Sequence, residues 1–242
     1  MPKSFLIAGH TQGKGEGAQN LQSKETENQI ARSLLLQAFP EIQKEVFTDL
    51  CPFDLSLEEK IAWVNKKAGV DDVVISCHLD SSSKRQEKGA MCYYYGGSKA
   101  SKNKAQKLLD EYCEKTGLKN NGVRPDTASR FQRLGIIRDT KGWAFLLELG
   151  SINNDLEVVK ERGSKSLLSG IKAVLEIKKT EDEPFSDVSK KHPYFSAAHW
   201  AKKQGVAKGY GDCRLGIDET LSVGRFLAFL KNYDQSEKIK DS

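Results

Sequence analysis

A short apolar segment that ends in polar residues constrains the fold of this chain more than any other feature. Residues 73–77 read Val-Val-Ile-Ser-Cys, a run rich in β-branched side chains with two aspartates before it. Such a run is typical of a buried strand in a parallel sheet. His78 and Asp80 follow directly. In open α/β sheets ligands bind at the carboxyl ends of the strands, so His78 is a candidate functional residue.

Similar apolar runs alternate with amphipathic helical patterns over the first 178 residues. In the first helical pattern, which begins at Glu27, apolar residues recur at 31, 34, 35 and 38, and Pro40 is expected to end the helix. The alternation predicts an α/β fold, in which a mainly parallel twisted sheet is covered by helices on both faces. The expected strands are 4–8, 45–47, 73–77, 90–95, 134–137 and 144–149, the expected helices are 27–39, 56–67, 98–115 and 164–178, and residues 120–133 are expected to form a loop.

A charged segment divides the chain. Residues 179–184 lack apolar anchors and end in a proline, which is typical of a linker between a first domain, residues 1–178, and the rest. Residues 185–242 contain several aromatic side chains and two helical patterns, at 193–204 and 222–232. They predict a small, mostly α-helical C-terminal module.

Composition narrows the class of protein. Of 242 residues 38% are hydrophobic, no apolar run is long enough to span a membrane, and the N-terminal segment is too short for a signal peptide, so we expect a cytoplasmic location. Five scattered cysteines argue against a disulfide framework and against a cysteine-only zinc site. The net charge of +5 suits a polyanionic surface such as a cell wall, but no basic and aromatic stripe indicates nucleic-acid binding.

Three residues of the first domain could carry chemistry. His10 follows one expected strand as His78 follows another, and two imidazoles with a carboxylate around one cation form a catalytic zinc site. Glu148 lies inside an apolar strand, where a carboxylate must be paired, protonated or close to a metal. It could be the general base that takes a proton from the metal-bound water, or the partner of a structural ion pair with Arg138 or a lysine; the residues alone do not separate these.

In four blocks the chain resembles the zinc-dependent N-acetylmuramoyl-L-alanine amidases of the amidase-3 type. The likeness covers residues 3–177 and rests on Ile-Ala-Gly-His10, on Ile-Ser-Cys-His78-Leu-Asp80-Ser, on Lys88-Gly-Ala leading into Tyr93-Tyr-Tyr, and on Leu134-Gly-Ile-Ile-Arg138 before Ala144-Phe-Leu-Leu-Glu148-Leu-Gly. It implies hydrolysis of the amide between N-acetylmuramic acid and L-alanine in peptidoglycan. By this resemblance His10 and His78 bind zinc and Glu148 is the catalytic base. The third zinc ligand is then Glu27, with Glu25 as the alternative.

The C-terminal residues resemble one S-layer homology module. The likeness rests on segments 185–188, 198–201 and 205–212, and Ser222-Val-Gly-Arg225 stands where the family usually has Thr-Arg-Ala-Glu. Such modules bind secondary cell-wall polymers, which makes Trp200, Tyr210 and Arg225 the wall-binding candidates. Three modules commonly build one binding site, so a single module implies that chains associate into a homo-oligomer if they bind polymer.

The combined expectation is a peptidoglycan amidase with a wall-targeting module. Without an export signal the chain is similar to a phage endolysin, which stays in the cytoplasm until it is released to the cell wall. Two alternatives are a catalytically inactive wall-binding protein and a zinc peptidase that acts on peptidoglycan stem peptides.

Overall fold

The computed structural model describes residues 2–81, 88–176, 185–189, 191–210 and 213–240, without the side chains of 234–240. Its chain divides into two compact units. The first comprises Met1–Gln43 and Phe47–Ile177, and the second comprises Lys44–Val46 and Lys178–Ser242. The expected linker at 179–184 lies outside the described residues.

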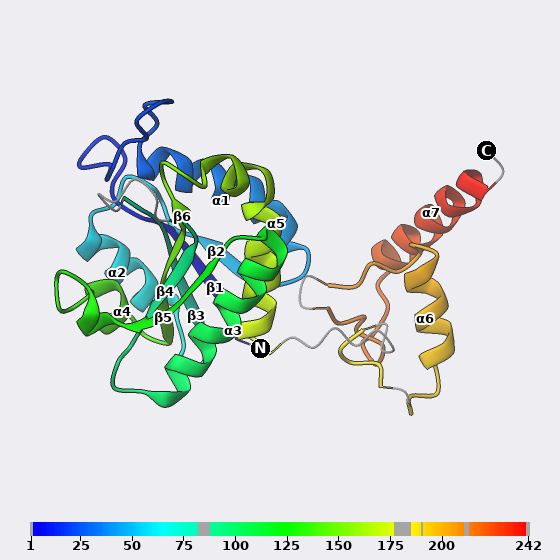
Figure 1. The fold of residues 1–242 in the computed structure, drawn as a ribbon. Coiled ribbons are helices and arrows are strands. Elements are labelled where there is room, and N and C mark those ends of the chain that lie inside the picture. The colour runs from blue at the N-terminus through cyan, green and yellow to red at the C-terminus, as the bar shows by residue number, and fades with distance from the viewer. Residues whose placement is uncertain (1, 82–87, 177–184, 190, 211–212, 241–242) are drawn as a thin grey trace. The chain divides into compact units, whose positions relative to one another are not determined.

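A six-stranded sheet forms the centre of the first unit (Figure 1). The order β2-β1-β3-β6-β4-β5 places the long, buried strands in the middle. Strands β1, β2, β3 and β6 run parallel, whereas β4 is antiparallel to β6 and pairs in parallel with β5. The predicted mainly parallel sheet is confirmed. The strands are β1 (Ser4–Ala8), β2 (Thr48–Leu50), β3 (Val73–Asp80), β4 (Ala90–Tyr94), β5 (Asn120–Pro125) and β6 (Trp143–Ser151).

Helices cover both faces of this sheet, as predicted. Helices α1, α3 and α5 pack together on one face, and α2 and α4 contact each other on the opposite face (Figure 1). Under α2 and α4 lies an apolar cluster that includes Phe5, Val74 and Leu146. Ser56 caps α2 through a reciprocal capping box with Glu59. The helices of this unit are α1 (Glu27–Gln43), α2 (Leu57–Lys67), α3 (Lys99–Thr116), α4 (Gly135–Arg138) and α5 (Leu156–Val174).

Two predicted elements of the first unit are wrong. Residues 134–137 form the short helix α4 instead of a strand, because a brief apolar run buries Ile136 and Ile137 equally well in either form. Residues 120–133 are not a continuous loop, since they contain the edge strand β5 and a 3-10 turn at Asp126–Ala128. An edge strand pairs on one side only and keeps polar, exposed residues, so it lacks the apolar signature of a strand.

Several predicted boundaries are also wrong. Strand β3 runs to Asp80 and therefore contains His78, whereas the expected strand ended at Cys77. Strand β2 begins at Thr48, after the expected 45–47. Helix α1 continues past Pro40 to Gln43, because the buried Ile42 anchors its last turn. Helix α5 begins at Leu156 and not at residue 164; its first turns carry mostly charged residues but bury Leu156 and Val159.

The second unit has two helices and a small apolar core. Helices α6 (Phe195–Lys203) and α7 (Val223–Lys240) confirm its mostly α-helical character, although α7 is longer than expected. Phe185, Val188, Ala198 and Ala207 form the core. The carboxylate of Asp187 accepts hydrogen bonds from backbone N–H groups at 215, 216 and 217, which fixes the connecting segment.

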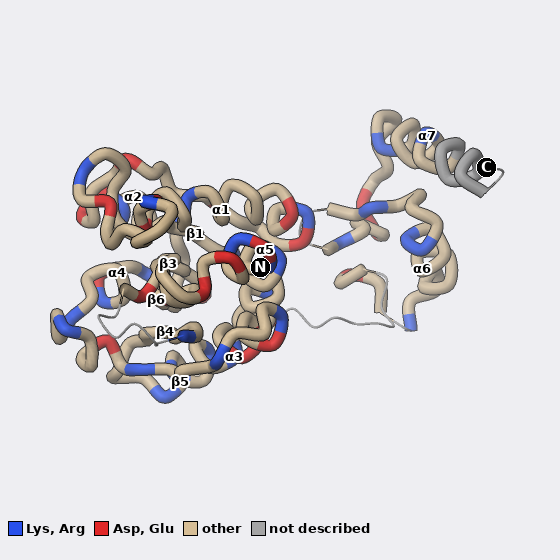
Figure 2. Tube along the Cα trace, turned by 45° about the horizontal axis from the view of Figure 1, so that its top comes forward, with Lys and Arg blue, Asp and Glu red and all other residues tan. Residues whose placement is uncertain are grey.

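Charges are spread over both units. Figure 2 shows lysine and arginine interspersed with aspartate and glutamate along the trace of each unit. Within the described residues, no helix is both long enough and apolar enough to cross a bilayer.

Candidate metal and catalytic site

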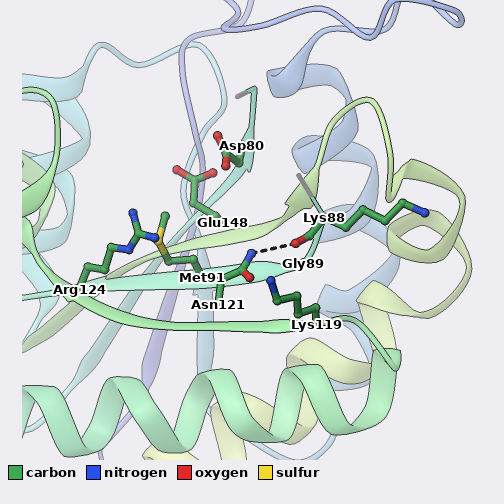
Figure 3. Close-up of a pocket in the computed structure, with 8 residues that line it drawn as sticks. All are labelled: Asp80, Lys88, Gly89, Met91, Lys119, Asn121, Arg124 and Glu148. Carbon is green, nitrogen blue, oxygen red and sulfur yellow. Dashed lines mark hydrogen bonds between the residues drawn. The ribbon is translucent and has the colours of Figure 1, made fainter. Parts of the chain in front are cut away.

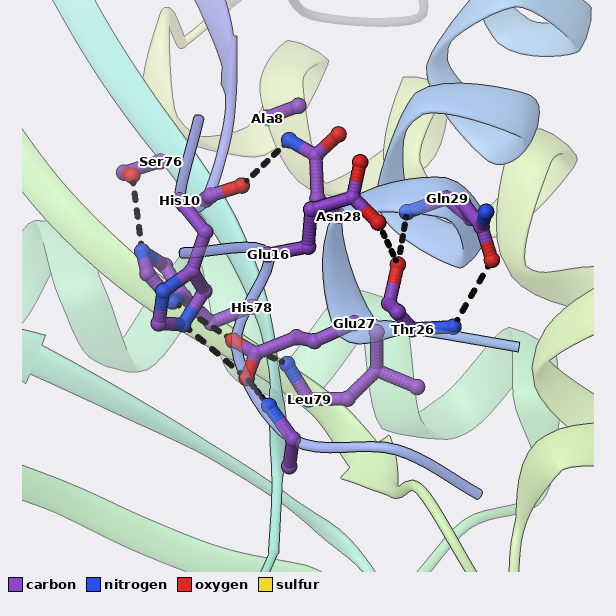
Figure 4. A network of polar contacts seen from close by, with 12 residues as sticks. Ala8, His10, Glu16, Thr26, Glu27, Asn28, Gln29, Ser76, His78 and Leu79 are labelled. Atoms are coloured by element: carbon purple, nitrogen blue, oxygen red, sulfur yellow. Dashed lines mark hydrogen bonds and ion pairs between the residues drawn. The ribbon is translucent and has the colours of Figure 1, made fainter. Parts of the chain in front are cut away.

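The ends of β1 and β3 and the start of α1 bring His10, Glu27 and His78 together (Figure 4). Glu27 Oε2 lies 3.0 Å from His10 Nε2, and Glu27 Oε1 lies 2.8 Å from His78 Nδ1. One donor atom from each residue lies within 4.8 Å of the other two. These are the three residues expected as metal ligands, and their donor atoms face one another as coordination of a single ion requires.

Glu27 is a buried carboxylate whose hydrogen bonds keep it ionised. Its exposed fraction is 5%. Burial alone would raise its pKa, but the hydrogen bonds and charges of His10 and His78 outweigh burial and bring the pKa to about 2. The ionised form is the one that binds metal. Glu25, the alternative ligand, instead forms an ion pair with Lys160 on α5.

Neighbouring polar groups hold this donor set in position. Ser76 Oγ lies 3.2 Å from His78 Nε2 and can accept a hydrogen bond from its N–H, which leaves the lone pair of Nδ1 directed at the ion site. Asn28 Nδ2 donates to the carbonyl of Gly9 at 2.8 Å. The buried Lys60 of α2 donates to the carbonyls of Ala8, at 3.0 Å, and His10. Zinc prefers such a set of two histidines and a carboxylate supported by a second layer of hydrogen bonds, so these residues fit the ion.

Two glycines leave room for the donor side chains. A Cβ atom at Gly9 would lie 2.5 Å from the His78 ring. Gly17 has a left-handed φ of 82°, and a Cβ atom there would lie 2.6 Å from Glu27 Oε2 and from His10 Cδ2. The glycine-rich segment after His10 therefore packs against the site, a role that its spacing alone did not reveal.

Sequence reasoning missed the supporting residues, although two of them carried a signal. Ser76 is a polar residue inside an apolar strand. Lys60 lies one helical turn before the buried Val64, on the inward side of α2. A polar or charged residue on a buried face needs a specific partner, and here the partners are groups of the site.

Glu148 lies beside this donor set on β6. Its Cα atom pairs with that of His78, and its side chain lines a cavity of about 400 Å³. Its Oε2 atom is buried and has no hydrogen-bond partner among the described residues. Burial, followed by the negative charges of Glu27 and Asp80, raises the pKa of Glu148 well above its usual value.

The ion-pair interpretation of Glu148 with Arg138 is wrong. Arg138 forms two hydrogen bonds to the carboxylate of Asp126 instead. A carboxylate with a raised pKa and an unpartnered oxygen, facing a cavity next to a metal donor set, has the features of a general base.

In the second unit the structure brings together two of the three wall-binding candidates. Arg225 lies over the ring of Tyr210, 4.6 Å from its centroid, and both side chains bind Glu219, at 3.2 and 2.6 Å. Trp200 lies beside Tyr233 of α7 instead, with ring centroids 6.3 Å apart. The shared contacts to Glu219 give Tyr210 and Arg225 a structural role within this unit.

Residues 5–173 match the family model of N-acetylmuramoyl-L-alanine amidase, and residues 184–222 match the S-layer homology domain. No curated protein matches the chain.

Several solved structures share the fold of the first unit. The catalytic domain of CwlV, an N-acetylmuramoyl-L-alanine amidase from Bacillus (Paenibacillus) polymyxa, is 25% identical, with 73% of this chain and 99% of that chain covered and a TM-score of 0.60. The catalytic domain of an endolysin targeting Clostridia difficile is 26% identical, with 73% and 98% covered and a TM-score of 0.57. An N-acetylmuramoyl-L-alanine amidase from Clostridium difficile 630 is 18% identical, with 72% and 96% covered and a TM-score of 0.61.

The amidase model spans well over half of the chain, over the residues that form the sheet, the donor set and Glu148. The chain therefore belongs to the N-acetylmuramoyl-L-alanine amidase family, acts as such an amidase on peptidoglycan, and carries an S-layer homology domain.

Proposed function

We propose that this amidase is a zinc hydrolase in which His10, Glu27 and His78 hold the ion and Glu148 is the catalytic base. The observation that carries the proposal is the buried, ionised Glu27, whose two oxygens face His10 Nε2 and His78 Nδ1. When bound, zinc supplies Lewis acidity toward the scissile carbonyl and toward a water molecule.

In this proposal Glu148 transfers a proton from the attacking water to the leaving amine. It accepts a proton from the attacking water, whose oxygen bonds to the lactyl carbonyl carbon. The bond from that carbon to the alanine nitrogen then breaks, and Glu148 returns the proton to the departing amine. Its raised pKa supports both steps, because the buried site favours the protonated intermediate form of the side chain. The products are a lactyl carboxylate and an L-alanine N-terminus.

The metal ligands are tested by zinc content. Glu27→Ala is expected to lose stoichiometric zinc, whereas Glu25→Ala, which removes a nearby carboxylate engaged with Lys160, should retain it. Zinc is measured by elemental analysis after gel filtration. If Glu27→Ala keeps its zinc, the ligand assignment is wrong.

Glu148 is tested with zinc and activity measured together. Glu148→Ala is expected to keep the fold and the zinc but to stop the release of L-alanine N-termini from purified walls. Retained zinc with full activity would exclude the base role.

The bond that is cleaved separates the alternatives. New lactyl carboxyl ends on muramic acid support the amidase reaction, whereas new ends within the stem peptide indicate a peptidase. A protein that binds walls and zinc but releases neither end would be an inactive wall-binding protein.

We also propose a lytic role for this enzyme, with a cytoplasmic location until release to the wall. The likeness to the endolysin catalytic domain supports this role. Expression in the host cytoplasm should leave cells intact until a membrane-permeabilising agent is added. Lysis without the agent, or no lysis with it, would contradict the proposal.

Wall targeting by the second unit is the remaining part of the proposal. The S-layer homology match supports binding of a secondary cell-wall polymer by a surface that includes Trp200, Tyr210 and Arg225, in an associated form of the chain. Walls stripped of the polymer should bind less protein than intact walls. Sedimentation analysis would show whether the protein that binds is a monomer or an oligomer.

A further inference from the structure

The cavity beside Glu148 extends over β4 to the edge strand β5 (Figure 3). Glu148 and Asp80 line it beside the donor set. Two cations line it along β5, Lys119 just before the start of the strand and Arg124 near its end. Lys88 contributes through its backbone, because its carbonyl accepts a hydrogen bond from Asn121 while its side chain extends away from Glu148.

Strand register places Arg124 on the same face of the sheet as the proposed base. Glu148 pairs with Met91 of β4, and Tyr93, two residues further along β4, pairs with Arg124 of β5. Paired residues project to one face of a sheet, as do residues two apart. Arg124 therefore lies two strands from Glu148, a lateral separation of about 10 Å from the usual strand spacing.

Neither of these two cations has an acidic partner among the described residues. Lys119 and Arg124 are exposed, and within the described part of the chain neither forms an ion pair with a carboxylate. Cations that line a cavity next to a reaction centre are suited to a substrate group of opposite charge.

The chemistry of the substrate decides which part of it carries that charge. The only carboxyl group of N-acetylmuramic acid is consumed in the scissile amide, so an anionic group near this bond belongs to the stem peptide. The two-residue offset along the strand adds to the lateral separation of about 10 Å and places the backbone of Arg124 about 12 Å from that of Glu148. An extended peptide advances about 3.5 Å per residue, so the long side chain of Arg124 meets its second or third residue.

We propose that Arg124 binds a carboxylate on the second or third residue of the stem peptide and so selects unamidated stems. This inference rests on the proposed amidase reaction at Glu148. It assigns to β5 a specificity role and leaves the chemical step to the other end of the cavity. A guanidinium suits this role because it can bind a carboxylate through two parallel hydrogen bonds.

The test pairs an enzyme change with a substrate change. Three synthetic N-acetylmuramoyl tripeptides are compared, which bear one free carboxylate on the second residue, one on the third residue, or none because both are amidated. The native enzyme is expected to cleave one carboxylate substrate with kcat/KM about tenfold above the amidated one, mainly through KM. Arg124→Gln should abolish this preference by lowering kcat/KM on the carboxylate substrate to the level of the amidated one. Arg124→Lys should restore part of the preference.

The amidated substrate serves as the internal control for folding. Lys102→Gln removes the same charge from the exposed side of α3, on the opposite face of the sheet, and should keep the full preference. Equal rates of the native enzyme on all three substrates, or an equal loss on all three in Arg124→Gln, would overturn the subsite and leave the amidase proposal intact. No cleavage of any of them by the native enzyme would overturn both.

Discussion

Glu148 is buried, so its ionised form destabilises the folded protein. For an acid whose pKa is raised in the folded state, the folded protein binds more protons than the unfolded chain, so stability falls as pH rises from the usual pKa of 4.5 toward the raised one. Glutamine cannot ionise and avoids this loss. Metal-free Glu148→Gln should match the native protein at about pH 4 and become more stable than it as the pH rises toward about 8.

Thermal unfolding of both metal-free proteins across this pH range measures the difference. Glu161→Gln, an exposed position on α5, is the matched control and should show no comparable increase with pH. If Glu148→Gln is no more stable than the native protein at any pH, the carboxylate is not desolvated, and the basis for its role as a base is lost.

Gly15 and Gly17 share a backbone conformation but not an environment. Their φ angles are 67° and 82°, so alanine at either adds a similar left-handed strain of about 1–2 kcal/mol. A Cβ at Gly17 meets Glu27 and His10, whereas a Cβ at Gly15 has no atom within 4 Å. Gly17→Ala should weaken zinc binding by about tenfold or more, and Gly15→Ala should not. Chelator competition measures both, and equal affinities would show that this segment does not support the site.

Strands that are buried on both faces could be predicted from the sequence, whereas the edge strand β5 could not. Strands β1, β3 and β6 are apolar runs, and the same pattern placed His10, His78 and Glu148 at or near strand ends. Strand β5 pairs on one side only, so its residues carry no apolar signal, and Arg124 was missed with it.

The individual residues that support the donor set could not be predicted from the sequence either. The family resemblance favoured Glu27 over Glu25, but what separates them physically is the start of α1, which directs Glu27 inward and leaves Glu25 to Lys160. Ser76 and Lys60 act through hydrogen bonds between segments distant in the chain. Such pairings depend on tertiary geometry, which local patterns do not contain.

Helix α2 provides one such supporting residue, Lys60, whose role can be tested. Its buried Lys60 donates to the carbonyls of Ala8 and His10, and His10 has a left-handed φ of 60° that this contact fixes. Lys60→Met keeps the length of the side chain but leaves both carbonyls without this donor. Loss of such support to a ligand typically lowers metal affinity by about 10–100-fold, which is the change expected for zinc.

Lys66→Met is the matched variant, because Lys66 is exposed on the same helix, and it should bind zinc as the native protein does. Lys60→Arg, which retains donors, should recover part of the affinity. Native zinc affinity in Lys60→Met would mean that the end of β1 is held without this lysine.

At the scale of the whole molecule, the two units have separate apolar cores and separate candidate roles. The donor set and Glu148 lie in the first unit, whose cluster includes Phe5 and Val74, while Phe185 and Val188 belong to the core of the second. A site that is complete within one unit should work without the other on a small soluble substrate, and the described residues that line this cavity belong to the first unit.

A chain that ends at residue 177 should therefore cleave a soluble muramoyl peptide with kcat/KM within about twofold of the full chain. On intact walls its rate should fall by about 100-fold or more at low enzyme concentration, because linked binding raises the effective concentration of the catalytic unit at the wall. The ratio of the two rates, measured on both substrates, separates targeting from catalysis. Equal losses on the soluble peptide and on walls would show that the second unit stabilises the first, and equal retention on both would show that it does not target the enzyme at all.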